Sequence, residues 1–270
     1  MLGYDDTELL IEKINQWYGY DFSGYARASL RRRIEGFFLK NKFSSYSSME
    51  LSLAQDPACF TRFVEEITVN VTEMFRDPGF YRALREKILP VLATYPFIRI
   101  WHAGCSTGEE VYSMAILLSE ASLLHKSILY ATDVNQAVLE KARTGIFAGA
   151  SMQQYSENYM LSGGQKDFSS YYTANYNSAK FAPWLGERII FSSHNLVADS
   201  SFNEFQLILC RNVLIYFDKQ LQVKVLQLFD KSLDSLGFLA LGSKESIRFS
   251  GIADRYRQVD PKEKIWRKSR

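Results

Sequence analysis

The spacing of apolar residues changes near residue 95 of the chain. Before that point apolar positions recur three and four residues apart without strict alternation, which predicts helices. We expect a first helix capped by Thr7 and carrying Leu10, Ile14 and Trp17 on one side. Further helices are expected over residues 25–40, 48–55, 57–67 and 77–93, the first of these burying Leu30, Ile34, Phe37 and Phe38.

From residue 97 short apolar runs alternate with amphipathic helices. This texture predicts an α/β fold, a doubly wound and mostly parallel sheet with helices on both faces. Strands are expected at 98–102, 128–132, 188–192, 205–210 and 238–241, and a terminal hairpin over 257–268. Residues 149–182, rich in Ser, Gly, Asn and Tyr, fit no regular element and are interpreted as a functional insertion or a mobile loop.

Composition narrows the classes of function. Of 270 residues, 32 are Lys or Arg and 30 are Asp or Glu, so the net charge of +2 is too balanced for binding nucleic acid by bulk charge. No apolar run approaches the ~18 residues of a membrane span, and the first residues lack a signal-peptide pattern, so we expect a cytoplasmic protein without membrane insertion. Three cysteines and three histidines have no metal-ligand spacing, so we expect reduced thiols and no metal.

The strongest local signal is the run from 98 to 110, a strand that enters a small-residue loop and opens a helix. Gly104 and Gly108 allow a ligand to approach the backbone closely. Asp133, at the end of the next strand, lies where a nucleotide-binding α/β unit places a carboxylate against ribose hydroxyls. We therefore predict a nucleoside site.

Charge then restricts the ligand. The helix after Gly108 opens with Glu109 and Glu110, which would repel the pyrophosphate of a dinucleotide. Two acids suit a cationic ligand, and S-adenosylmethionine carries both a sulfonium and an ammonium group. Alternatively, one or both glutamates only complement the helix dipole.

Five segments in order resemble the CheR family of chemotaxis receptor methyltransferases over nearly the whole chain. They are 70–76 (NVTEMFR), 106–113 (STGEEVYS), 131–133 (ATD), 193–196 (SHNL) and 210–217 (CRNVLIYF). Departures from the family are modest: Val111 replaces a common proline, residues 242–246 replace a Gly-His-Ser-Glu turn, and His102, Gly104 and Cys105 stand where small or hydroxyl residues are common.

The resemblance implies a helical N-terminal domain over 1–75, a linking helix over 76–96, and a Rossmann-like class I methyltransferase domain over 97–270. An insertion at about 147–186 would form a small β-subdomain, which in some family members grips a receptor peptide. The cofactor would be S-adenosylmethionine and the product S-adenosylhomocysteine. The implied cofactor contacts are Asn70, Thr72, Arg76, Gly104, Glu109 or Glu110, Asp133, Asn195, Leu196, Asn212 and Val213.

The implied reaction is methyl-ester formation on glutamate side chains of a chemoreceptor-like protein, with Arg76 and Tyr216 beside the transferred methyl. A glutamate is already ionised at pH 7, so no general base is required. Arg27, Arg31, Arg32 and Arg33 would dock on acidic helices of the receptor, although they could also form only a solvated face. We expect a monomer. Alternatives are a methyltransferase with another protein or small acceptor, and a catalytically idle cofactor-binding module.

Overall fold

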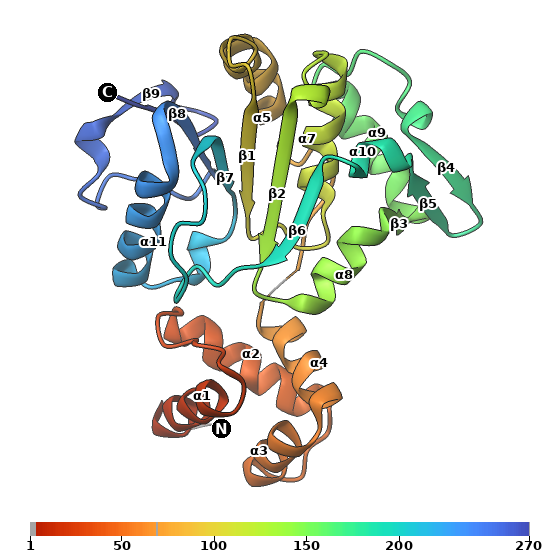
Figure 1. Cartoon of the computed structure of the whole chain (residues 1–270). Helices are drawn as coiled ribbons and strands as arrows, with labels where there is room; N and C mark the ends of the chain where they lie inside the picture. The colour runs from red at the N-terminus through yellow and green to blue at the C-terminus, as the bar shows by residue number, and fades with distance from the viewer. Residues whose placement is uncertain (1–3, 69, 270) are drawn as a thin grey trace.

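The computed structural model describes residues 4–68 and 70–269, which form a helical N-terminal domain and a sheet-containing domain (Figure 1). The N-terminal domain contains α1 (Tyr4–Tyr18), α2 (Arg27–Lys40), α3 (Tyr46–Gln55) and α4 (Pro57–Ile67). Ile14, Ile34, Leu53 and Ile67 are fully buried between these helices. The predicted helical domain is therefore present.

Two details of that domain differ from the sequence expectation. Because α1 begins at Tyr4, Thr7 lies inside the helix and is not its cap. Phe38 is only half-buried, since it packs against Phe43 and Tyr46 at the edge of the domain. Ser45 and Asp56 cap α3 and α4 with side-chain hydrogen bonds.

The linking helix is interrupted where a continuous α-helix was expected. It comprises α5 (Pro78–Ala83), a π-helical turn η1 (Leu84–Ile88) and α6 (Leu89–Leu92). Pro90 has no N–H to donate, and its ring would collide with the carbonyl four residues earlier. Just before Pro90 the helix changes from α to π hydrogen bonding: the Leu89 N–H donates to the Leu84 carbonyl, five residues earlier.

The seven-stranded sheet has the order β6-β2-β1-β7-β8-β10-β9. The first five strands in that order are parallel, and β10 and β9 add an antiparallel edge. The bounds are β1 (Ile98–Ala103), β2 (Ser127–Asp133), β6 (Ile189–Ser193), β7 (Phe205–Cys210), β8 (Leu233–Leu241), β9 (Tyr256–Asp260) and β10 (Ile265–Lys268). The predicted doubly wound, mostly parallel fold and its terminal hairpin are confirmed.

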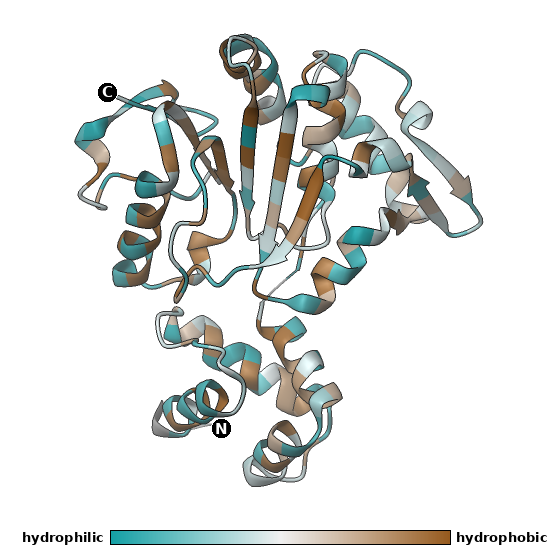
Figure 2. Ribbon diagram, in the orientation of Figure 1, coloured by the Kyte–Doolittle hydropathy of each residue, from teal (hydrophilic) through white to brown (hydrophobic). Residues whose placement is uncertain are grey.

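Both faces of this sheet are buried, because successive side chains of a strand point to opposite sides. Ile98 and Ile100 of β1 pack in one cluster with α7 (Glu109–Glu120). Trp101 lies in a second cluster with α11 (Lys219–Ser232). The central strand β7 is accordingly buried along its whole length, whereas a helix such as α11 alternates hydrophobic and hydrophilic positions (Figure 2).

The region from 149 to 182 is regular, so the interpretation as a mobile loop is wrong, and the small β-subdomain that the family resemblance implies is present. It contains η3 (Gly149–Ser151), α9 (Met152–Leu161), η4 (Phe168–Tyr171), β4 (Tyr172–Asn175) and β5 (Ser178–Phe181). The last two strands join β3 (Ile146–Ala148) in a three-stranded antiparallel sheet. The aromatic rings of Tyr159, Phe168, Tyr171 and Phe181 form its buried side, which compensates for the polar composition of the segment.

The remaining elements are η2 (Leu124–Lys126), α8 (Gln136–Thr144), α10 (Pro183–Gly186), η5 (Leu214–Tyr216) and η6 (Ala253–Arg255). The strands β1, β2 and β6 run toward the N-terminal domain, which lies beyond their carboxyl ends (Figure 1). In the part of the chain that the structure describes, no helix combines the length and apolarity needed to cross a membrane.

Candidate active site

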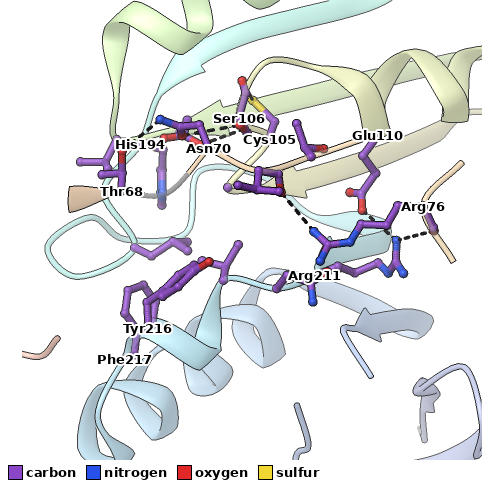
Figure 3. A pocket seen from close by; sticks show the side chains of 18 of the residues that line it. Thr68, Asn70, Arg76, Cys105, Ser106, Glu110, His194, Arg211, Tyr216 and Phe217 are labelled. Atoms are coloured by element: carbon purple, nitrogen blue, oxygen red, sulfur yellow. Dashed lines mark hydrogen bonds and ion pairs between the residues drawn. The ribbon is translucent and has the colours of Figure 1, made fainter. Parts of the chain in front are cut away.

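A pocket lies at the carboxyl ends of the parallel strands, between the sheet and the N-terminal domain. All predicted cofactor and catalytic residues except Glu109 line it: Asn70, Thr72, Arg76, Gly104, Glu110, Asp133, Asn195, Leu196, Asn212, Val213 and Tyr216. In Figure 3, Glu110, Arg76 and Arg211 gather at one end of this pocket, and Tyr216 and Phe217 lie across it from Ser106. Segments far apart in the sequence therefore meet at one site, as expected for a ligand site of a parallel α/β sheet.

The loop between β1 and α7 requires glycine at two positions. Gly104 has a φ of 79°, and a Cβ there would lie 2.5 Å from Val213 Cγ2. Gly108 has a φ of 94° and precedes the first residue of α7. A side chain would strain the backbone at both positions, and at Gly104 it would also collide with Val213 on the opposite wall.

Asp133 is fixed by the backbone at the end of β2. Its Oδ2 accepts a hydrogen bond from the Ser106 N–H at 2.9 Å, and its Oδ1 accepts one from the Asn135 N–H at 3.0 Å. Burial raises the pKa of Asp133, while these backbone hydrogen bonds oppose the shift. Each carboxylate oxygen retains a lone pair, so Asp133 can accept hydrogen bonds from ligand hydroxyls.

The two adjacent glutamates of α7 have different surroundings. Glu109 is buried away from the pocket, and its Oε2 accepts a hydrogen bond from Thr107 Oγ1 at 2.6 Å. Burial raises the pKa of Glu109. Glu110 lines the pocket and contacts His102 Nδ1 at 2.9 Å and Arg211 Nη1 at 3.4 Å. Of the two predicted alternatives, the structure thus places Glu110 in the pocket.

The contacts of Glu110 with His102 and Arg211 determine its charge. Burial alone would favour the neutral acid, but the hydrogen bond and charge interaction with His102, together with Arg211, hold the pKa of Glu110 below its ordinary value. Arg211 is itself almost fully buried, bridges to Asp77 Oδ2 at 2.6 Å and lies over the Phe80 ring at 4.0 Å. A carboxylate ionised at the pocket wall is suited to a cationic ligand group.

Arg76 comes from an unusually shaped segment. Both residues beside it, Phe75 and Asp77, have positive φ values of 52° and 59°. Such left-handed conformations in non-glycine residues are costly and concentrate at functional sites. The Phe75 N–H donates to Ser113 Oγ at 3.0 Å, and Arg76 Nη1 donates to the Val71 carbonyl at 3.1 Å. The segment therefore holds the Arg76 side chain against the pocket.

Tyr216 lies on the opposite wall, where the N-terminal domain supports it. The Arg33 guanidinium lies over its ring at 4.5 Å, and the Ala26 N–H donates to its carbonyl oxygen at 2.8 Å. Tyr25 packs edge-on against Phe217 and lines the pocket as well. The N-terminal domain thus forms part of the pocket itself.

The four predicted docking arginines separate into two groups. Arg33 is directed at Tyr216 and also donates to the carbonyl of Ile67. The other three, Arg27, Arg31 and Arg32, border a surface depression between α1 and α2. Two of them form ion pairs, Arg27 with Glu8 at 2.8 Å and Arg31 with Glu35 at 3.5 Å.

The residues present fit S-adenosylmethionine. Asp133 offers acceptors for ribose hydroxyls, the ionised Glu110 offers a partner for a cationic group, and Gly104 lines the pocket with its backbone alone. No phosphate cradle is needed or formed, because α7 opens with two acids. Among residues 4–68 and 70–269 no group of three or more potential ligands could hold a metal ion.

Sequence reasoning missed several residues of the site. The sequence pattern assigns no role to Arg211, and it marks His102 only as a departure from the family. Tyr25 was unassigned. A buried strand followed directly by an arginine, as at Cys210-Arg211, is the available signal, because an isolated buried cation requires a carboxylate partner.

Comparison with known proteins identifies the same two parts. Residues 5–68 match the family model described as the all-alpha domain of CheR methyltransferase, and residues 70–265 match its SAM-binding domain. Together these matches cover most of the chain. Thr68 and Asn70, at the facing ends of the two matches, both line the pocket.

Three curated relatives are similar over most of their length. Cher3 of Pseudomonas putida, which is named as a methyltransferase, is 47% identical over 98% of this chain and 97% of its own. A chemotaxis protein methyltransferase of Listeria monocytogenes is 30% identical over 85% of each chain. One of Salmonella typhimurium is 33% identical over 80% of this chain and 74% of its own. On the matches and the pocket together, the chain belongs to the CheR family and is an S-adenosylmethionine-dependent methyltransferase.

Proposed function

We propose that the protein transfers a methyl group from S-adenosylmethionine to glutamate side chains of a chemoreceptor-like signalling protein. The observation that carries this proposal is the position of Arg76. Its side chain is held at the pocket by a segment with two positive φ values and lies near Glu110 and Arg211 at one end of the pocket. A fixed guanidinium can bind an acceptor carboxylate in a two-pronged geometry.

The chain's residues would then act by binding and alignment. When bound, the cofactor supplies an electrophilic methyl group. Glu110 and Asp133 bind the cofactor, Arg76 orients the acceptor carboxylate, and Tyr216 borders the methyl path. An ionised glutamate needs no proton removed before it attacks. Catalysis would come from orientation and exclusion of water.

The acceptor would reach the pocket along α2. Arg31 and Arg32 lie on the helix that also carries Arg33, whose guanidinium contacts Tyr216. Residues 1–75 carry eight basic and eleven acidic residues, so these arginines form a local basic patch in an otherwise acidic domain. An acidic helix lying on α2 would thus have its glutamates near the pocket.

The test uses labelled S-adenosylmethionine and membranes from the source cells, followed by mild alkali. Base-labile label on a receptor-sized membrane protein supports the proposal, because methyl esters hydrolyse in alkali. Alkali-stable label would contradict it and indicate an N-methyl product. Label only on soluble or small acceptors would indicate a methyltransferase acting elsewhere, and tight cofactor binding without any label would indicate an idle module.

Two pairs of variants refine the test. Arg76→Ala and Tyr216→Phe should lower turnover far more than affinity for S-adenosylhomocysteine, and unchanged turnover in both would refute their assignment. Arg31→Glu combined with Arg32→Glu should weaken methylation and its salt dependence. The matched control is Arg257→Glu, an exposed arginine of β9.

A further inference from the structure

Glu245 lies outside the predicted site but contacts the backbone of one pocket wall. It is 5% exposed and follows β8 in the turn that begins at Gly242. Its Oε2 accepts hydrogen bonds from the N–H groups of Gly242 at 2.6 Å and Asn212 at 3.1 Å. Its Oε1 accepts from Val213 at 2.9 Å and from Ile215 at 3.3 Å. One buried carboxylate therefore binds four backbone amides.

The local backbone explains why these amides need such an acceptor. The β7–β8 ladder ends at the pair Cys210 and Leu241, so the residues beyond it have no strand partner there. Asn212 then turns the chain with a φ of 61°, and the N–H groups that follow converge on one point. Buried N–H groups without an acceptor would be strongly unfavourable.

The turn at Gly242 is shaped to bring the carboxylate close. A Cβ on Gly242 would lie 2.8 Å from the Asn212 nitrogen and 2.8 Å from Glu245 Oε2. Only glycine leaves the two chain segments this close together. The hydrogen bonds therefore depend on a second residue besides Glu245, which provides an independent way to disturb them.

The segment that Glu245 holds is the wall that carries Asn212, Val213 and Tyr216. Val213 faces Gly104 across the pocket, where a Cβ on that glycine would lie within 2.5 Å of it. On its outer side, the same segment pairs with the N-terminal domain: the Ala26 N–H donates to the Tyr216 carbonyl at 2.8 Å. The wall is thus held from two sides by residues distant in sequence.

We infer that Glu245 is a positioning residue, which sets the conformation of residues 212–216 and thereby the fit of the cofactor and the position of Tyr216. The inference rests on the proposed function only where it concerns acceptor methylation. Its effects on cofactor affinity and on amide protection are independent of which acceptor is used.

The experiment compares Glu245→Gln with wild type by hydrogen exchange and by the binding of S-adenosylhomocysteine. Glutamine keeps the size of the side chain but replaces one acceptor oxygen with a donor, so at least one pair of amides loses its partner. Either the Asn212 amide, which is bound to Oε2, or the Val213 and Ile215 amides, which are bound to Oε1, should exchange faster, while those of β1 keep their protection. The dissociation constant should rise about 10- to 100-fold, the range for hydrogen bonds to a charged group.

The matched control is Asp230→Asn, in another buried carboxylate that lies away from the pocket. Asp230 is 4% exposed, accepts from the Tyr256 hydroxyl at 3.1 Å and pairs with Arg255 at 2.6 Å. This variant should lose stability and protection near the terminal hairpin but keep its affinity for S-adenosylhomocysteine. A purely structural role of Glu245 would make the two variants behave alike.

Gly242→Ala provides the second disturbance if Glu245→Gln does not fold. It should give the same local loss of protection and a smaller loss of affinity, because the added methyl displaces the carboxylate from the Asn212 amide. Unchanged affinity and unchanged protection of these amides in either folded variant would overturn the inference. A wild-type protein that binds S-adenosylhomocysteine but methylates no glutamate would refute the proposed function alone.

Discussion

The two ends of helix α7 each hold a carboxylate in contact with an arginine, but they differ in how completely it is bound. At the carboxyl end, Glu120 has no exposed side-chain surface. Its oxygens meet Arg85 Nη2 at 2.5 Å, the Tyr171 hydroxyl at 2.9 Å and the Gln165 N–H at 3.1 Å, and they also accept from the Tyr159 hydroxyl. This carboxylate joins the linking helix to the inserted subdomain.

At the amino end, Glu110 keeps 18% of its side-chain surface exposed. Its contact with Arg211 is 3.4 Å, longer than the Arg85 contact of Glu120. The difference in exposure and contacts gives the two carboxylates different roles. A carboxylate with every oxygen occupied stabilises the fold, whereas one with capacity left at a pocket wall can bind a ligand.

The largest expected effect is on stability, from Glu120→Gln. Loss of the charge leaves Arg85 buried without its partner, and breaking such a pair costs about 3–5 kcal/mol. Urea unfolding should show this loss, while the folded variant keeps its affinity for S-adenosylhomocysteine. Glu157→Gln, at an exposed position of α9, is the control and should change stability by less than about 0.5 kcal/mol. A loss of affinity without a loss of stability would remove the distinction between the two ends.

The next effect is on binding, from Glu110→Gln. The variant loses the charge that faces the pocket, so affinity for S-adenosylhomocysteine should fall about 10- to 100-fold, or 1.5–3 kcal/mol. Titration calorimetry measures it. 5′-Methylthioadenosine, which lacks the amino-acid group, serves as the control ligand and should bind wild type and variant alike. An equal loss for both ligands would show that Glu110 acts on the pocket's shape and not on a cationic group.

Much of the fold was predictable because burial imposes a period on the sequence. The strand at residues 205–210 is buried on both faces, so its apolar run is continuous and its bounds were predicted correctly. The inserted subdomain was implied only by the family resemblance and not by the local pattern, because its strands are short and β4 is mostly exposed. Its order comes from aromatic packing and from Glu120, which are contacts between residues distant in sequence.

The site was predictable wherever a motif follows a strand and less so elsewhere. The segments around Gly104, Asp133 and Asn212 were located because each follows a strand of the parallel sheet. The choice between Glu109 and Glu110 was not decidable, since adjacent helix residues point about 100° apart and the sequence does not fix the helix's rotation. The role inferred for Glu245 depends on its contact with Val213, 32 residues away in the chain, which no local pattern encodes.

A smaller effect is expected from Asp77→Asn. This variant tests whether the ion pair with Asp77 or the one with Glu110 positions Arg211. Asp77 is 46% exposed and pairs with the buried Arg211 at 2.6 Å, so this pair should contribute only about 0.2–1 kcal/mol. Asparagine also tolerates the left-handed backbone at this position. Affinity for S-adenosylhomocysteine should change no more than about fivefold by calorimetry. A change as large as that of Glu110→Gln would mean that Asp77, and not Glu110, sets the position of Arg211.

The smallest effect separates the two neighbouring glutamates by pH. Burial raises the pKa of Glu109, so the folded state takes up protons more readily than the unfolded state, and this group's contribution to stability falls as pH rises above about 4.5. Glu109→Gln removes that unfavourable contribution. From pH 4 to pH 7 the free energy of unfolding of the variant should therefore rise relative to that of wild type, by less than about 1 kcal/mol.

For Glu110 the sign is opposite. Its lowered pKa contributes stability that is present above the unfolded value and lost as pH falls through the folded one. Urea unfolding should thus give Glu110→Gln a lower free energy of unfolding than wild type at pH 7, and this difference should shrink as the pH falls. For Glu109→Gln, the free energy of unfolding relative to wild type should instead decrease as the pH falls. Parallel pH profiles for the two variants would contradict the assignment of one glutamate to the fold and the other to the pocket. The test is sharp because the residues are adjacent, so any effect of the α7 dipole or of net charge is shared by both variants and cancels in their comparison.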